Sequence, residues 1–173
     1  MTASDAREVW QRGPVPGVPA LLQPVAHALL QATEDAEKYM EGFPSQLLWV
    51  TPGGVASAGF HLLHMSGVVD RLFTYARGES LSERQLKNLA AEKEVSGAPI
   101  QPGHLVDAFR AQVETAISQL KKTSESTLTE TRFIGRKQIP TTVQGLLFHA
   151  AEHCQRHMGQ LLVTARILQA RIV

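Results

Sequence analysis

Apolar residues recur at intervals of three and four along four long segments of the chain, which is the spacing of an amphipathic helix. These segments cover about residues 21–40, 55–77, 104–122 and 141–169. A shorter helix is expected up to about Glu94, because Ser80–Glu83 and Ser82–Gln85 both have the spacing of a capping box. Its mixed-charge run, residues 84–94, is most simply a solvated helix face.

The segments between these helices contain the residues that interrupt regular structure. Residues 1–20 are rich in Pro and Gly and are expected to form an irregular arm, and residues 41–54 a loop. Residues 123–140 are rich in Thr and Ser and are compatible with a weak hairpin before the last helix. Thr141 and Gln144 have the spacing of a capping box at the start of that helix.

The pattern as a whole predicts an all-α fold. Four long amphipathic helices that each bury one face form a four-helix bundle, here with a short extra helix and a small hairpin. A length of 173 residues suits one well-buried core. We therefore expect an arm over residues 1–20 and a single bundle domain over residues 21–173.

Composition and charge narrow the classes of partner. Lys and Arg total 17 against 16 Asp and Glu, and a net charge of +1 provides no field for binding nucleic acid. No apolar run approaches the ~20 residues that span a bilayer, and the polar start of the chain is unlike a secretory signal. A lone cysteine, Cys154, excludes an internal disulfide and suits a reducing compartment. We expect a cytoplasmic protein with neither nucleic-acid nor membrane partners.

The last helix carries polar side chains where its periodicity predicts buried ones. Its expected inward-facing positions are Val143, Leu146, Ala150, His153, His157, Gln160, Thr164 and Leu168. An unpaired polar group in a core costs ~1–3 kcal/mol, so the three successive polar positions His153, His157 and Gln160 require an explanation. Each histidine could hydrogen-bond a carbonyl or a neighbouring side chain. Alternatively, two imidazoles one turn apart could share a metal ion with a histidine of a facing helix.

The second long segment supplies two candidates for that facing histidine, His61 and His64. On a helical wheel centred on Met65, His61 lies about 40° from the inward-facing stripe and His64 about 100° from it. Spacing alone therefore favours His61.

Three stretches of the chain resemble the DinB family of helical-bundle metalloproteins. They are PGGVASAGFHLLH (52–64), HMSGVVDRLFTYARGE (64–79) and HCQRHMGQ (153–160). The resemblance implies a four-helix bundle whose metal ligands are His64, His153 and His157. It places His61 and His149 beside the site as flanking residues or alternative ligands. Met158 stands where many family members have Arg.

The resemblance also implies a class of chemistry. Related proteins include metal-dependent hydrolases and enzymes that transfer groups with a low-molecular-weight thiol. Three protein ligands and an open coordination position fit a divalent ion, Zn or Ni, in an enzyme acting on a small molecule. A non-catalytic metal-binding or sensing protein is the alternative, favoured if a fourth protein ligand closes the site. A helical protein whose histidines are merely hydrogen-bonded is a third.

Other features of the site are less defined by the sequence. Gln160, one turn beyond His157, could orient a bound water or a ligand ring, or could satisfy a buried backbone group. Cys154 is more simply a packing residue than a nucleophile. No catalytic residue is identified. A homodimer is expected because related bundles pair through exposed helix faces.

Overall fold

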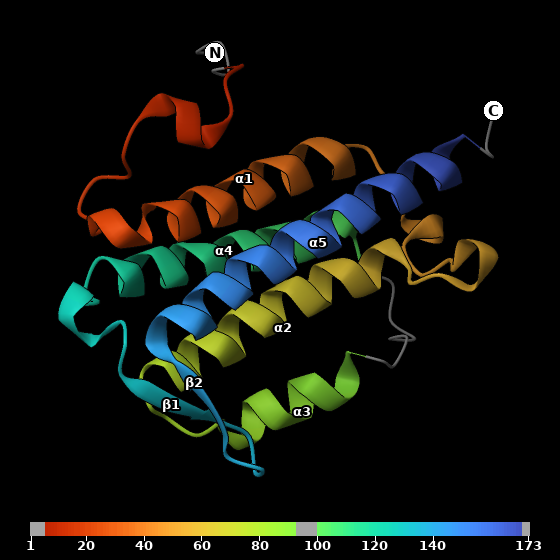
Figure 1. Ribbon diagram of the computed structural model, residues 1–173. Helices are drawn as coiled ribbons and strands as arrows, with labels where there is room; N and C mark the ends of the chain where they lie inside the picture. Colours follow the sequence, from red (N-terminus) through yellow and green to blue (C-terminus); the bar gives the residue numbers. More distant parts are fainter. Residues whose placement is uncertain (1–5, 93–99, 171–173) are drawn as a thin grey trace.

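The computed structural model describes residues 6–92 and 100–170, and within them four long helices lie side by side (Figure 1). They are α1 (Gln23–Met40), α2 (Ala58–Ala76), α4 (Pro102–Leu120) and α5 (Val143–Gln169). α1 and α2 each pack against both α4 and α5, so α1 and α2 lie diagonally opposite each other. The expected all-α bundle is confirmed.

Two smaller elements lie beside α2. The short helix α3 (Glu83–Ala91) packs on α2, and β1 (Thr131–Ile134) pairs antiparallel with β2 (Ile139–Thr142) immediately before α5 (Figure 1). The remaining described elements are short 3-10 turns: η1 (Val9–Arg12), η2 (Ala20–Leu22), η3 (Ser45–Leu47), η4 (Pro52–Gly54) and η5 (Glu125–Thr127). The short helix and the hairpin expected from the sequence are both present. No helix among the described residues has the length and apolarity needed to cross a membrane.

The helix starts agree only partly with the predicted caps. Ser82 forms the expected capping box with Gln85 at the start of α3. At α5, however, Thr142 is the cap, and its side chain accepts a hydrogen bond from the Gly145 backbone N–H at 3.0 Å. The predicted cap at Thr141 is wrong because the hairpin keeps the chain extended through residue 142.

The buried face of α5 differs from the predicted stripe. Cys154, Met158 and Leu161 are in the core, whereas His153 and His157 are half-buried and Gln160 is exposed. Both sets of positions have helical spacing. The first set is apolar, so burying it removes more apolar surface from contact with water. The expectation that the histidines face the bundle interior is therefore wrong, and they lie at the edge of the core.

The loop before α2 fixes where that helix begins. The backbone N–H of Gly59 donates to the Leu48 carbonyl at 2.8 Å. A Cβ at Gly59 would lie 2.5 Å from the Trp49 ring, so only glycine lets the indole pack this closely on the helix. These contacts hold the first turn of α2 directly before its two histidines.

Candidate metal centre

Three histidine rings meet where α2 crosses the edge of α5. His64 comes from α2, and His153 and His157 lie one turn apart on α5. One ring nitrogen of each lies within 4.8 Å of the other two. Nε2 of His64 lies 3.0 Å from Nε2 of His153. The structure thus brings together the three residues that the family resemblance singles out.

The three rings are accessible because they flank the core rather than fill it. All three residues are half-buried, and the His64 side chain keeps 20% of its surface exposed. The apolar neighbours Met65 and Cys154 occupy the core positions beside them. The rings therefore lie against a packed interior on one side and are partly exposed on the other.

The His64 ring is held in one orientation by contacts on two sides. Its Nδ1 lies 2.8 Å from Oε2 of Glu92, and because a carboxylate can only accept, Nδ1 donates the hydrogen bond. In the neutral ring the lone pair is then on Nε2, the atom that faces His153. Phe60 stacks on the same ring, with centroids 5.2 Å apart and an interplanar angle of 11°.

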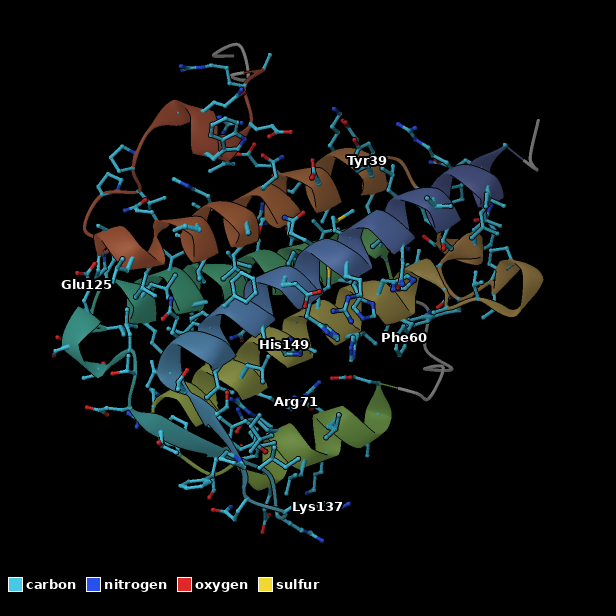
Figure 2. The ribbon with its side chains drawn as sticks, in the orientation of Figure 1. Tyr39, Phe60, Arg71, Glu125, Lys137 and His149 are labelled. Atoms are coloured by element: carbon cyan, nitrogen blue, oxygen red, sulfur yellow. The ribbon has the colours of Figure 1, made fainter. Side chains whose placement is uncertain are left out.

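Glu92 and Arg71 form a buried ion pair behind His64. Their side chains are 7% and 10% exposed, and Arg71 extends from α2 towards α3 (Figure 2). Burial alone would raise the pKa of Glu92, but hydrogen bonds from His64 and Arg71 outweigh it and lower the pKa. Glu92 could not be identified from the sequence, because the mixed-charge run around it, residues 84–94, indicated a solvated face.

His61 lies behind the cluster rather than in it. It is 3% exposed, and its Nδ1 is 2.9 Å from Nδ1 of His157. Burial, and then the nearby His64, lowers the pKa of His61 to about 4; burial also lowers the pKa of His157 to about 4. Both rings are therefore neutral at neutral pH. The helical wheel correctly placed His61 nearer the core, but His61 is not among the three whose donors meet.

The other residues considered from the sequence lie outside the three-histidine cluster. His149 has an exposed side chain with Nδ1 3.5 Å from a carboxylate oxygen of Glu152, and Gln160 is exposed. Burial raises the pKa of the Cys154 thiol to about 12, so a thiolate is strongly disfavoured there. Cys154 is a packing residue, as expected.

The donor set fits a divalent cation. Two nitrogens bound ~2.0–2.1 Å from one tetrahedral ion lie about 3.3 Å apart, close to the 3.0 Å between the Nε2 atoms of His64 and His153. Burial lowers the pKa of His153, so its ring also favours the neutral form that binds metal. His153 Nδ1 is a buried side-chain atom without a hydrogen-bond partner among the described residues. The three histidines could hold a metal ion.

The fold and the cluster together define a helical-bundle protein with a candidate three-histidine metal site. The sequence profile of the DinB superfamily matches residues 28–161, and the chain belongs to that superfamily. A crystal structure described as "the conserved protein of locus from Enterococcus faecalis" has a similar fold. It matches with a TM-score of 0.66 and 19% identity, over 86% of this chain and 97% of that one. No curated protein matches the chain significantly.

Proposed function

We propose that this protein binds a divalent metal ion, Zn or Ni, through His64, His153 and His157, and acts as a metal-dependent enzyme on a small molecule. The observation that carries the proposal is the convergence of three imidazole nitrogens from two helices within 4.8 Å. Two residues one turn apart on a helix and a third from its neighbour are an arrangement typical of protein metal sites.

The arrangement favours an open coordination position. Among the described residues, the group of donors that lie this close together contains neither His61 nor His149. The exposed part of the His64 side chain leaves the cluster accessible from solvent. A three-ligand site with room for an exchangeable group is characteristic of catalytic metal centres, whereas structural sites are closed by four protein ligands.

The chain's own residues would prepare the site rather than carry out the reaction. Glu92 fixes the donor atom of His64, and burial keeps His153 and His157 neutral. Glu152, the carboxylate next to His153, pairs with Arg156 and His149 on the exposed face of α5. A bound divalent ion would supply Lewis acidity, which activates water or stabilises a thiolate.

Metal stoichiometry tests the proposal directly. Protein purified without a His-tag or a nickel column, stripped with a chelator and titrated with Zn²⁺ and Ni²⁺ in a calorimeter should bind one equivalent. A heat of binding indistinguishable from that of buffer for both ions would overturn the proposal.

Two kinds of chemistry then have to be separated, hydrolysis and thiol-linked group transfer. We would load the protein with Co²⁺ and add glutathione, because a thiolate bound to cobalt produces an intense near-ultraviolet charge-transfer absorption. The appearance of that absorption supports the transferase type, whereas its absence together with turnover of activated esters supports the hydrolase type. Metal binding without either result favours the alternative, a non-catalytic metal-binding or sensing protein.

A further inference from the structure

Helix α3 buries polar side chains and leaves its leucines largely exposed, which is the reverse of the usual pattern in a surface helix. Its leucines Leu86 and Leu89 are 44% and 41% exposed, whereas Gln85 within the helix and Glu92 at its C-cap are 7% and 8% exposed. Both leucines of α3 are therefore only partly buried. The two positions that are buried are polar, one near each end of the helix.

The two buried polar residues attach α3 to α2 at different places. Gln85 donates through Nε2 to Oγ1 of Thr74 at 2.8 Å, far along α2 from the histidines. Glu92 accepts hydrogen bonds from His64 and Arg71. The end of α3 that carries Glu92 thus lies at the histidine cluster.

A glycine in α2 provides the space for this carboxylate. A Cβ at Gly67 would overlap Oε1 of Glu92 and lie 2.5 Å from Nη1 of Arg71. Glycine weakens a helix interior relative to alanine, so a glycine in the middle of α2 is unfavourable for the helix alone. Its absent side chain lets the Glu92 carboxylate approach the helix surface closely enough to reach His64.

From these contacts we infer that Glu92 is a positioning residue for the metal centre: it holds the Nδ1–H of His64 so that Nε2 is presented to the ion. This inference rests on the proposed function. An ion pair with Arg71 alone would need no contact with the histidine, yet Oε2 lies 2.8 Å from His64 Nδ1 and 3.4 Å from Nη2 of Arg71. A carboxylate behind a ligand histidine fixes the tautomer and makes the other nitrogen a better donor.

The first test is the affinity for Zn²⁺, measured by competition with a chromophoric chelator in Glu92→Ala, Glu92→Gln and Glu152→Gln. Loss of such a carboxylate typically weakens binding about 10- to 100-fold, which we expect for Glu92→Ala. Glu92→Gln should lose less, because its amide oxygen still accepts from Nδ1–H. Glu152→Gln, which removes a nearby exposed charge, should bind as the wild type does.

The second test separates positioning from folding, because Glu92→Ala leaves a buried Arg71 unpaired and could unfold the protein. Gly67→Ala displaces the carboxylate and leaves both charged side chains in the chain. We expect it to remain folded by circular dichroism and to lose Zn²⁺ affinity. Gly103→Ala is the matched control, because a Cβ at that helical glycine meets nothing within 4 Å.

The third test reads the tautomer of His64 in the metal-free protein. Nitrogen-15 NMR should find the proton of His64 on Nδ1 in the wild type and a tautomer mixture in Gly67→Ala, where the carboxylate is displaced. A purely structural role for Glu92 would leave the affinity of all variants unchanged while lowering only their stability.

The outcomes distinguish this inference from the proposed function. If the wild type binds Zn²⁺ tightly, and Gly67→Ala and both Glu92 variants bind it equally well, the inference is overturned and the metal site stands. If the wild type binds no metal, the proposed function fails, and the inference fails with it. Weakened Zn²⁺ binding in Gly67→Ala, together with normal binding in Gly103→Ala, supports the inference that Glu92 positions His64.

Discussion

Burial opposes the protonation of His61, which is 3% exposed and whose Nδ1 lies 2.9 Å from Nδ1 of His157. Its side chain is too enclosed to be hydrated as a cation, and the neighbouring histidines offer no negative charge in compensation. The cost of protonating it therefore appears in the stability of the whole fold.

This cost gives a pH dependence with a defined sign. The pKa of His61 is about 4 in the folded protein against 6.5 for an ordinary histidine, so the unfolded chain binds the proton first as the pH falls. The metal-free protein should lose about 3 kcal/mol of unfolding free energy from this group between pH 7 and pH 4.

Urea unfolding in the presence of a chelator, repeated across that range, measures the loss. His61→Gln keeps a polar partner for His157 and should flatten the pH dependence. His104→Gln, which removes an exposed histidine of α4, should leave it as steep as in the wild type. Equal slopes in all three proteins would contradict the role of His61.

At the scale of the elements, the position of the α5 cap provides a test that discriminates between two neighbouring residues. Thr142 caps the helix through the Gly145 N–H. Thr142→Ala should therefore cost about 1 kcal/mol of stability, whereas Thr141→Ala should cost clearly less. Chemical denaturation at neutral pH measures both, and a larger loss for Thr141→Ala would show that the helix starts one residue earlier than described.

The elements themselves could be predicted from the sequence because a helix that buries one face must repeat its apolar residues with a period of 3.6. Which face of α5 is buried could not be predicted from the sequence. Ala150, His153 and His157 are separated by steps of three and four residues, and Ala150, Cys154 and Met158 by two steps of four. Both spacings follow one face of a helix, so periodicity does not rank the two overlapping stripes. Packing in the bundle distinguishes the two stripes, because the apolar one is buried and the imidazoles lie at the edge of the core.

Only the candidate metal-binding histidines of the site were predictable from the sequence. His64, His153 and His157 could be named because their motifs resemble a known family, although the helical wheel favoured His61. Glu92 could not be found in this way, since a charged residue in a mixed-charge run resembles any solvated position. Its contact with His64 bridges 28 residues of sequence and depends on how α3 folds back on α2. The contact also depends on Gly67, a glycine in the middle of α2 where a Cβ would overlap the Glu92 carboxylate.

At the scale of the whole molecule, metal binding should appear as added stability. An ion that binds the folded protein and not the unfolded chain stabilises it by about 2.7 kcal/mol at a concentration 100 times its Kd. For a chain of this size such a gain raises Tm by about 5–10 °C. Thermal unfolding with Zn²⁺ should show this rise in the wild type, whereas an unchanged Tm would contradict a site formed only on folding. His153→Ala should show no rise.

Association is the second expectation at this scale, and the homodimer stays a prediction. The outer side of α5 exposes Phe148, Val163 and Ile167, with exposed fractions of 61%, 57% and 42%. Exposed apolar side chains on one helix are a candidate surface for pairing. Sedimentation velocity at micromolar concentration should find a dimer, and Val163→Asp should shift it towards monomer. A wild-type protein that sediments only as a monomer would contradict this expectation.

The most direct test of the central claim, that His64, His153 and His157 act as one metal site, is the metal content of single alanine variants after loading with Zn²⁺. Removing any one of the three leaves two ligands, so all three variants should lose the ion. His149→Ala should retain it, because the side chain of His149 lies on the exposed face of α5. Full occupancy in all four variants would contradict the site. Retention in His64→Ala with loss in His61→Ala would contradict the assignment of His64.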